Sequence, residues 1–159
     1  QRVEVSAGYS GTPLPKKLGI VDDAVFTVLH APPSFKETLG DVGTAIWQRN
    51  LMPPIDVIVA FYTEKAALRD EWAKLTDAAQ PARGVWVAWP KKTSGVATDI
   101  TEDVLRATLL KTGWVDNKVC AIDDIWSGLR FVMRKENRPP WKRWAPPGTG
   151  ARLAVNAAW

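Results

Sequence analysis

The feature that most constrains the fold is a strand, helix and strand pattern in the middle of the chain. Residues 55–61 (IDVIVAF) and 85–89 (VWVAW) are continuous apolar runs, typical of strands that are covered on both faces. Residues 64–79 between them are amphipathic, with apolar side chains at helical spacing on one stripe: Ala67, Leu68, Trp72 and Leu75. A crossover of this kind makes its two strands parallel. The pattern therefore predicts an α/β sheet.

Weaker patterns precede this unit. Residues 12–19 predict a short helix with Thr12 as its N-cap. Residues 24–29 predict a strand, and Ser34 is the expected cap of a brief helix after it. Residues 45–48 are a weak strand candidate, so the predicted sheet extends towards the N-terminus.

The patterns after residue 90 predict one more helix and a hairpin. Asp99 is the expected N-cap of the helix, and Glu102 follows it at the spacing of a capping box. Residues 114–122 and 129–134 predict strands whose connection is too short for a parallel return, so they should form an antiparallel hairpin. We predict one α/β domain with a mostly parallel sheet, helices on both faces and an antiparallel C-terminal hairpin.

Length and charge divide the chain unevenly. Its 159 residues suffice for one domain with a sizeable core. We expect that domain to be residues 1–138, with a short N-terminal arm at 1–20, and residues 139–159 to be a Trp- and Pro-rich tail docked on it. The tail carries three of the 21 basic side chains and none of the 17 acidic ones. The nearly neutral body argues against a wide surface for nucleic acid.

Cysteine and histidine each occur once. Cys120 lies in an apolar run, so we expect it to be buried, and a lone cysteine excludes an intramolecular disulfide and a cysteine-based zinc site. His30 alone excludes a His-rich metal centre, and we predict no metal site. The sequence shows no signal peptide and no apolar segment of about 18 residues. We therefore expect a cytoplasmic protein without a membrane span.

Polar residues follow the expected strands at one edge of the sheet. In open α/β sheets ligands bind outside the carboxyl ends of the parallel strands. Asp123 and Asp124 join this edge if the strand from Trp114 is parallel to the others. A merely solvated edge is the alternative reading. The candidate ligand-binding residues are His30, Tyr62, Lys91, Lys92, Ser94, Gly95, Asp123 and Asp124.

The loop after residue 90 has the composition of an anion site. Two ammonium groups, hydroxyls and the flexible Gly95 can converge on a phosphate or carboxylate. The acids of the following helix turn, Asp99, Glu102 and Asp103, would repel an anion from the helix start. A small anionic ligand is therefore expected on the loop itself.

The tail carries a second candidate surface. Trp141 and Trp144 flank Lys142 and Arg143, an arrangement that can stack on bases and neutralise phosphates. The same residues would also serve to cover the core or to contact another subunit in a homo-oligomer. Both readings stay open from the sequence.

Three segments carry a family resemblance. Residues 7–20, 86–106 and 116–138 resemble a family of small bacterial proteins classed as a domain of unknown function. The resemblance covers nearly all of residues 7–138. That family brings no established activity, so the resemblance implies a fold and no catalytic residues.

The order of elements is similar to that of Rossmann-like methyltransferases, which also end in an antiparallel hairpin. The resemblance implies a Rossmann-like domain of three layers. Those enzymes need a glycine-rich turn after their first strand, whereas residues 29–33 read Leu-His-Ala-Pro-Pro. Their acidic residue for the ribose would fall at residues 48–50, which are Gln, Arg and Asn. We therefore expect no S-adenosylmethionine in the usual mode and predict no cofactor.

Three functions remain at this point. The first is a non-enzymatic binding or interaction module on a degenerate methyltransferase-like scaffold, with a small anionic ligand or a protein as its partner. The second is an enzyme in which Lys91 and Lys92 hold an anionic substrate while His30 or Asp123 moves protons. The third is RNA or ribonucleoprotein binding through the tail.

Overall fold

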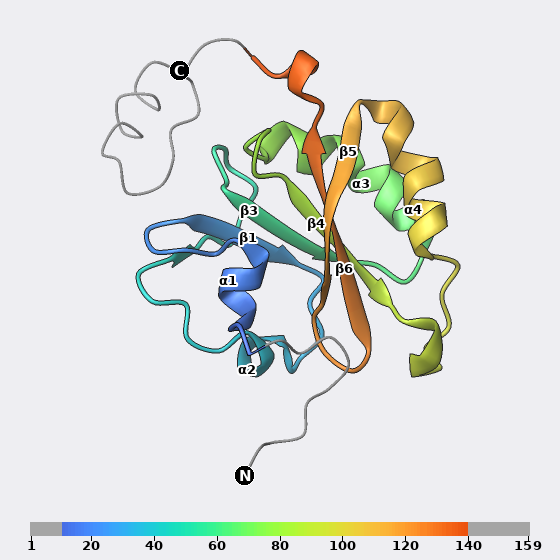
Figure 1. Ribbon diagram of the computed structural model, residues 1–159, viewed down its shortest axis with the longest axis horizontal. Coiled ribbons are helices and arrows are strands. Elements are labelled where there is room, and N and C mark those ends of the chain that lie inside the picture. The colour runs from blue at the N-terminus through green and yellow to red at the C-terminus, as the bar shows by residue number, and fades with distance from the viewer. Residues whose placement is uncertain (1–10, 140–159) are drawn as a thin grey trace.

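The computed structural model describes residues 11–139, which form a sheet of six strands in the order β2-β1-β3-β4-β6-β5 (Figure 1). The first four strands in this order pair in parallel, and β6 pairs antiparallel with both β4 and β5. This confirms the predicted α/β class and its hairpin. The strands are β1 Val25–Leu29, β2 Ile46–Trp47, β3 Val57–Phe61, β4 Val85–Pro90, β5 Trp114–Ala121 and β6 Trp126–Met133.

Helices cover both faces of the sheet. Figure 1 shows α1 (Leu14–Leu18) and α2 (Phe35–Leu39) on one side, and α3 (Lys65–Ala78) and α4 (Glu102–Leu109) on the other. Strand β4 alternates between the two apolar clusters, since Val87 packs with α3 and α4. Its neighbour Trp86 packs with α1 and α2. Short 3₁₀ helices follow at η1 Lys92–Ser94, η2 Leu110–Thr112 and η3 Lys135–Asn137.

Two cap predictions are wrong. Thr101, not Asp99, is the N-cap of α4, and its Oγ1 accepts a hydrogen bond from the Val104 N–H at 3.1 Å. The carboxylate of Asp99 instead accepts the Lys65 N–H at the start of α3, at 2.7 Å. Asp99 therefore satisfies a free N–H of the neighbouring helix. The N-cap of α1 is Pro13 rather than Thr12, because the fixed φ of a proline suits the start of a helix.

The hairpin pairs over more residues than its sequence predicts. Strand β6 begins at Trp126, and Gly128 pairs with both Ala88 and Cys120. A glycine fits inside this strand because a Cβ there would lie 3.2 Å from Cε3 of Trp86. Cys120 is buried, as expected from its apolar run. No helix among residues 11–139 is long and apolar enough to cross a membrane.

The topology brings several strand ends to one edge. Strand β5 runs in the same direction as β4, because both are antiparallel to β6. The ends of β1, β3, β4 and β5 therefore share the edge at which ligands are expected. The strand order reverses between β1 and β3. Open α/β sheets place their principal ligand crevice at such a switch point.

Candidate functional site

A small crevice lies at the switch point. It has a volume of about 200 Å³, and its walls come from the ends of β1 and β3 and from the first turns of α3. The lining residues are His30, Phe61, Tyr62, Thr63, Glu64, Ala67 and Glu71. Two of the predicted ligand residues, His30 and Tyr62, are therefore brought together here.

Two titratable side chains meet one carboxylate oxygen of a third in this crevice. Nε2 of His30 lies 2.9 Å from Oε1 of Glu71, and the Tyr62 hydroxyl donates to the same oxygen at 2.5 Å. The rings of His30 and Tyr62 also meet edge to face, with centroids 5.5 Å apart. We call these three residues the switch-point cluster. Its hydrogen bonds join β1, β3 and α3.

The backbone of His30 is strained. Its φ is 59°, in the left-handed region. A non-glycine residue in that region costs on the order of 1 kcal/mol or more and persists only where its surroundings hold it. The hydrogen bond to Glu71 supplies such a restraint, so the cluster holds an imidazole in an otherwise unfavourable position.

The protonation states fit this geometry. Burial tends to raise the pKa of Glu71, but hydrogen bonds from Tyr62 and His30 and the positive charges of His30 and Lys74 outweigh it and lower that pKa. Burial, together with the Glu71 hydrogen bond and charge, raises the pKa of Tyr62 above its ordinary value. At neutral pH Glu71 is therefore an ionised acceptor and Tyr62 a protonated donor.

Glu71 was not among the ligand-binding residues predicted from the sequence. Glu71 lies three residues after Leu68 and four before Leu75, both of which are fully buried on the sheet side of α3. Residues at that spacing share one face of a helix. A carboxylate on the apolar stripe was thus the signal that could have found it.

The crevice is unsuited to the anionic ligand expected at this edge. Within residues 11–139, two carboxylates line it, those of Glu64 and Glu71, and no lysine or arginine does. The imidazole of His30 is already paired with Glu71. An anion would therefore meet net repulsion in the crevice.

The predicted anion loop lies after β4 and outside the crevice. The Ser94 hydroxyl donates to the Lys91 carbonyl at 2.7 Å and accepts the Val96 N–H at 3.2 Å. Gly95 has a φ of 78°, and Lys92 is exposed. The serine is therefore engaged in shaping the loop. An anion site here stays a prediction.

The acids of the hairpin turn have a local role. Oδ1 of Asp123 accepts the Ile125 N–H at 2.8 Å and the Trp126 N–H at 2.7 Å, as turn-forming aspartates do. Asp124 is exposed beside it. The Lys91 N–H donates to the Ile125 carbonyl at 2.7 Å and ties this turn to the loop after β4. The structure thus brings Lys91 near the hairpin turn, apart from the switch-point cluster.

The positions at which a Rossmann-like fold recognises a nucleoside cofactor are altered. The turn after β1 has no glycine, and Pro32 and Pro33 lead directly into α2. After β2, Gln48 donates to the Asn50 and Met52 carbonyls, and the Arg49 guanidinium lies 4.9 Å from the centre of a Trp47 ring. No carboxylate stands at the end of β2. The tail candidates Trp141, Lys142, Arg143 and Trp144 lie outside the described residues.

Comparison with solved structures decides the fold. A protein designated a type 11 methyltransferase from Sulfolobus solfataricus superposes with a TM-score of 0.57, covering 79% of this chain and 92% of that one at 9% identity. The chain has a methyltransferase-like fold. An S-adenosylmethionine-dependent methyltransferase from Aquifex aeolicus matches at a TM-score of 0.48 and 11% identity, over 74% of this chain and 87% of that one.

Sequence comparison adds no family. No family model and no curated protein sequence matches this chain. At such low identity the structural likeness shows the fold alone. The expected resemblance to Rossmann-like methyltransferases is therefore confirmed for the scaffold, and the resemblance to a family of small bacterial proteins stays a prediction.

Proposed function

We propose that this chain is a non-enzymatic binding or interaction module on a methyltransferase-like scaffold that does not take S-adenosylmethionine in the usual mode. One observation carries the proposal. At the switch point, where a cofactor would approach the sheet, Nε2 of His30 and the Tyr62 hydroxyl are both hydrogen-bonded to Oε1 of Glu71. Groups already paired within the protein offer little to an incoming ligand.

The size of the crevice supports the same conclusion. Its volume of about 200 Å³ lies below the roughly 300–1,000 Å³ of ordinary small-molecule sites. The turn after β1 adds to this, because Ala31, Pro32 and Pro33 carry side chains where a glycine would let backbone approach a nucleoside. The switch-point cluster then has a structural role, because its hydrogen bonds join the ends of two strands to a helix.

Protein purified from its source tests the proposal by native mass spectrometry. We expect a retained ligand or protein partner whose mass differs from those of S-adenosylmethionine and S-adenosylhomocysteine. Retention of either cofactor at one per chain would contradict the proposal. The His30→Ala variant is the control, because a ligand that binds elsewhere on the protein should still be retained by this variant.

One observation favours an enzyme as the second candidate. Glu71 orients the imidazole of His30 at 2.9 Å, and the His30 side chain remains 49% exposed. A carboxylate-oriented imidazole open to solvent is the arrangement of a general base. Turnover on a panel of small-molecule substrates that His30→Ala abolishes would establish this function in place of the first, provided that Lys36→Ala, an exposed position that does not line the crevice, leaves it intact.

A further inference from the structure

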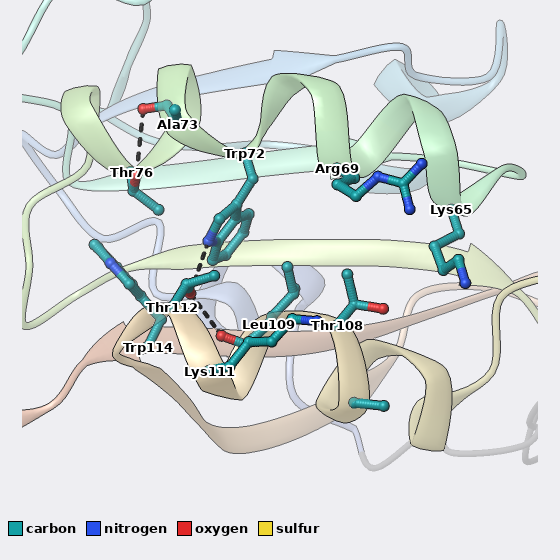
Figure 2. Close-up of a pocket in the computed structure, with 11 residues that line it drawn as sticks. Lys65, Arg69, Trp72, Ala73, Thr76, Thr108, Leu109, Lys111, Thr112 and Trp114 are labelled. Carbon is teal, nitrogen blue, oxygen red and sulfur yellow. Dashed lines mark hydrogen bonds between the residues drawn. The ribbon is translucent and has the colours of Figure 1, made fainter.

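A second hollow, of about 640 Å³, lies between α3 and α4 and is separate from the switch-point crevice (Figure 2). Figure 2 shows Lys65 and Arg69 on α3 towards one end, with the Trp72 side chain extending from α3 towards the segment after α4. We propose that this hollow, the α3–α4 groove, binds a small amphiphilic anion: an apolar, ring-sized body that carries a carboxylate or phosphate. The proposal does not rest on the function of the crevice.

The charges of the groove favour an anion. Among the described residues, the charged ones that line it are Lys65, Arg69 and Lys111, and no acid does. Among residues 11–139 none of these three cations has a carboxylate within 4.0 Å. Such a concentration of unpaired positive charge attracts anionic ligands.

The contrast with a nearby arginine on α4 is informative. Arg106 contacts three carboxylates, those of Glu102 at 2.5 Å, Asp116 at 3.0 Å and Asp103 at 3.8 Å. Acids on α4 and β5 therefore neutralise a cation of α4 that does not line the groove. Within residues 11–139, the cations that line the groove have no such partners.

The positions of the groove cations are unfavourable for the helix that carries them. Lys65 and Arg69 are like charges four residues apart, and such pairs repel across one helical turn. Lys65 is also the first residue of α3, where the helix dipole disfavours a cation, although the Asp99 carboxylate that accepts the Lys65 N–H at 2.7 Å already offsets part of this effect. An anion bound between the Lys65 and Arg69 side chains would relieve the repulsion between them.

The apolar part of the groove is already ordered. The rings of Trp72 and Trp114 meet edge to face, with centroids 6.0 Å apart. Nε1 of Trp72 donates to the Thr112 hydroxyl at 3.0 Å, and that hydroxyl donates to the Leu109 carbonyl at 2.5 Å. The volume lies within the range of small-molecule sites. A ligand would thus find preformed apolar walls in a groove that is also lined by cations.

The test uses two fluorescent probes that share one ring body. One is 1-anilinonaphthalene-8-sulfonate, whose sulfonate stands in for a carboxylate or phosphate, and the other is the uncharged N-phenyl-1-naphthylamine. We expect the anionic probe to bind about tenfold more tightly, and the triple change K65Q/R69Q/K111Q to weaken it about tenfold, since each exposed ion pair contributes little alone. The uncharged probe should change by less than about twofold. Equal binding of the two probes would overturn the proposal.

A matched control separates the groove from net charge. The variant K36Q/R134Q/K135Q loses the same charge from exposed positions outside the groove and should leave the affinity within about twofold. Equal weakening by both triple variants would overturn the proposal.

Thr108→Trp should exclude the anionic probe by filling the groove, and retained binding in a folded variant would contradict this site. Competition with 1-naphthoate and 1-naphthyl phosphate identifies the head group, and failure of both to displace the probe would also overturn it.

Discussion

Replacing Trp86 with alanine is expected to lower the free energy of unfolding by about 3–5 kcal/mol. The side chain is fully buried near the start of β4 and belongs to the apolar cluster that packs with α1 and α2. Its Nε1 also donates to the Leu18 carbonyl at 2.8 Å, which ties the last residue of α1 to the sheet. Urea denaturation followed by far-UV circular dichroism measures the loss.

Trp86→Phe separates the two contributions of this residue. Phenylalanine retains much of the apolar contact but leaves the Leu18 carbonyl without its donor, so we expect a smaller loss of about 1–3 kcal/mol. If Trp86→Ala lowers the free energy of unfolding by less than about 1.5 kcal/mol, this residue is not the support of the α1 face.

The second large effect is expected at Gly84, immediately before β4. Its φ is 79°, and an added Cβ would lie 2.0 Å from the Phe131 carbonyl oxygen and 2.9 Å from Cγ1 of Val132. Gly84→Ala must displace the backbone of β6 in addition to adopting a left-handed conformation. We expect Gly84→Ala to lower the free energy of unfolding by about 3 kcal/mol or more, because backbone strain and overpacking act together.

Gly95→Ala is the matched control for this change. Gly95 has nearly the same φ, 78°, but nothing lies within 4 Å of an added Cβ. Gly95→Ala should therefore lower the free energy of unfolding only by the cost of the left-handed conformation, about 1 kcal/mol. If thermal or urea denaturation shows that Gly84→Ala and Gly95→Ala lower the free energy of unfolding equally, the close approach of Gly84 to β6 does not contribute to stability.

The elements with a strong periodic pattern could be predicted from the sequence. The β-branched run that contains β3 and the apolar run of β4 mark strands buried on both faces, and α3 between them requires a parallel crossover. The short connection before β6 allows only a hairpin. In each case the information is local, because burial pattern and loop length determine the geometry.

Features that depend on the meeting of distant segments could not be predicted in this way. Asp99 looked like the cap of its own helix, yet its carboxylate reaches Lys65, which is 34 residues away in the sequence. Lys111 joins the α3–α4 groove only because η2 packs beside α3. Such contacts follow from the packing of one helix against another, which local sequence spacing does not encode.

The candidate site shows the same division. His30 and Tyr62 were expected at one edge because strand ends meet there, and the structure brings them together with Glu71. Their chemistry differs from the expected anion binding, because the third member is a carboxylate from α3. Lys91 and Lys92 lie at the same edge but do not line the crevice.

Calorimetric titration of S-adenosylmethionine into the purified protein tests the central claim most directly. We expect no saturable heat, which corresponds to a Kd weaker than about 1 mM. The reasons are the turn after β1 without glycine, the absence of an acid after β2, and the switch-point cluster, whose side chains are already hydrogen-bonded to one another. A one-to-one isotherm with a Kd below about 100 μM that is lost when Glu71 is changed to glutamine would contradict it.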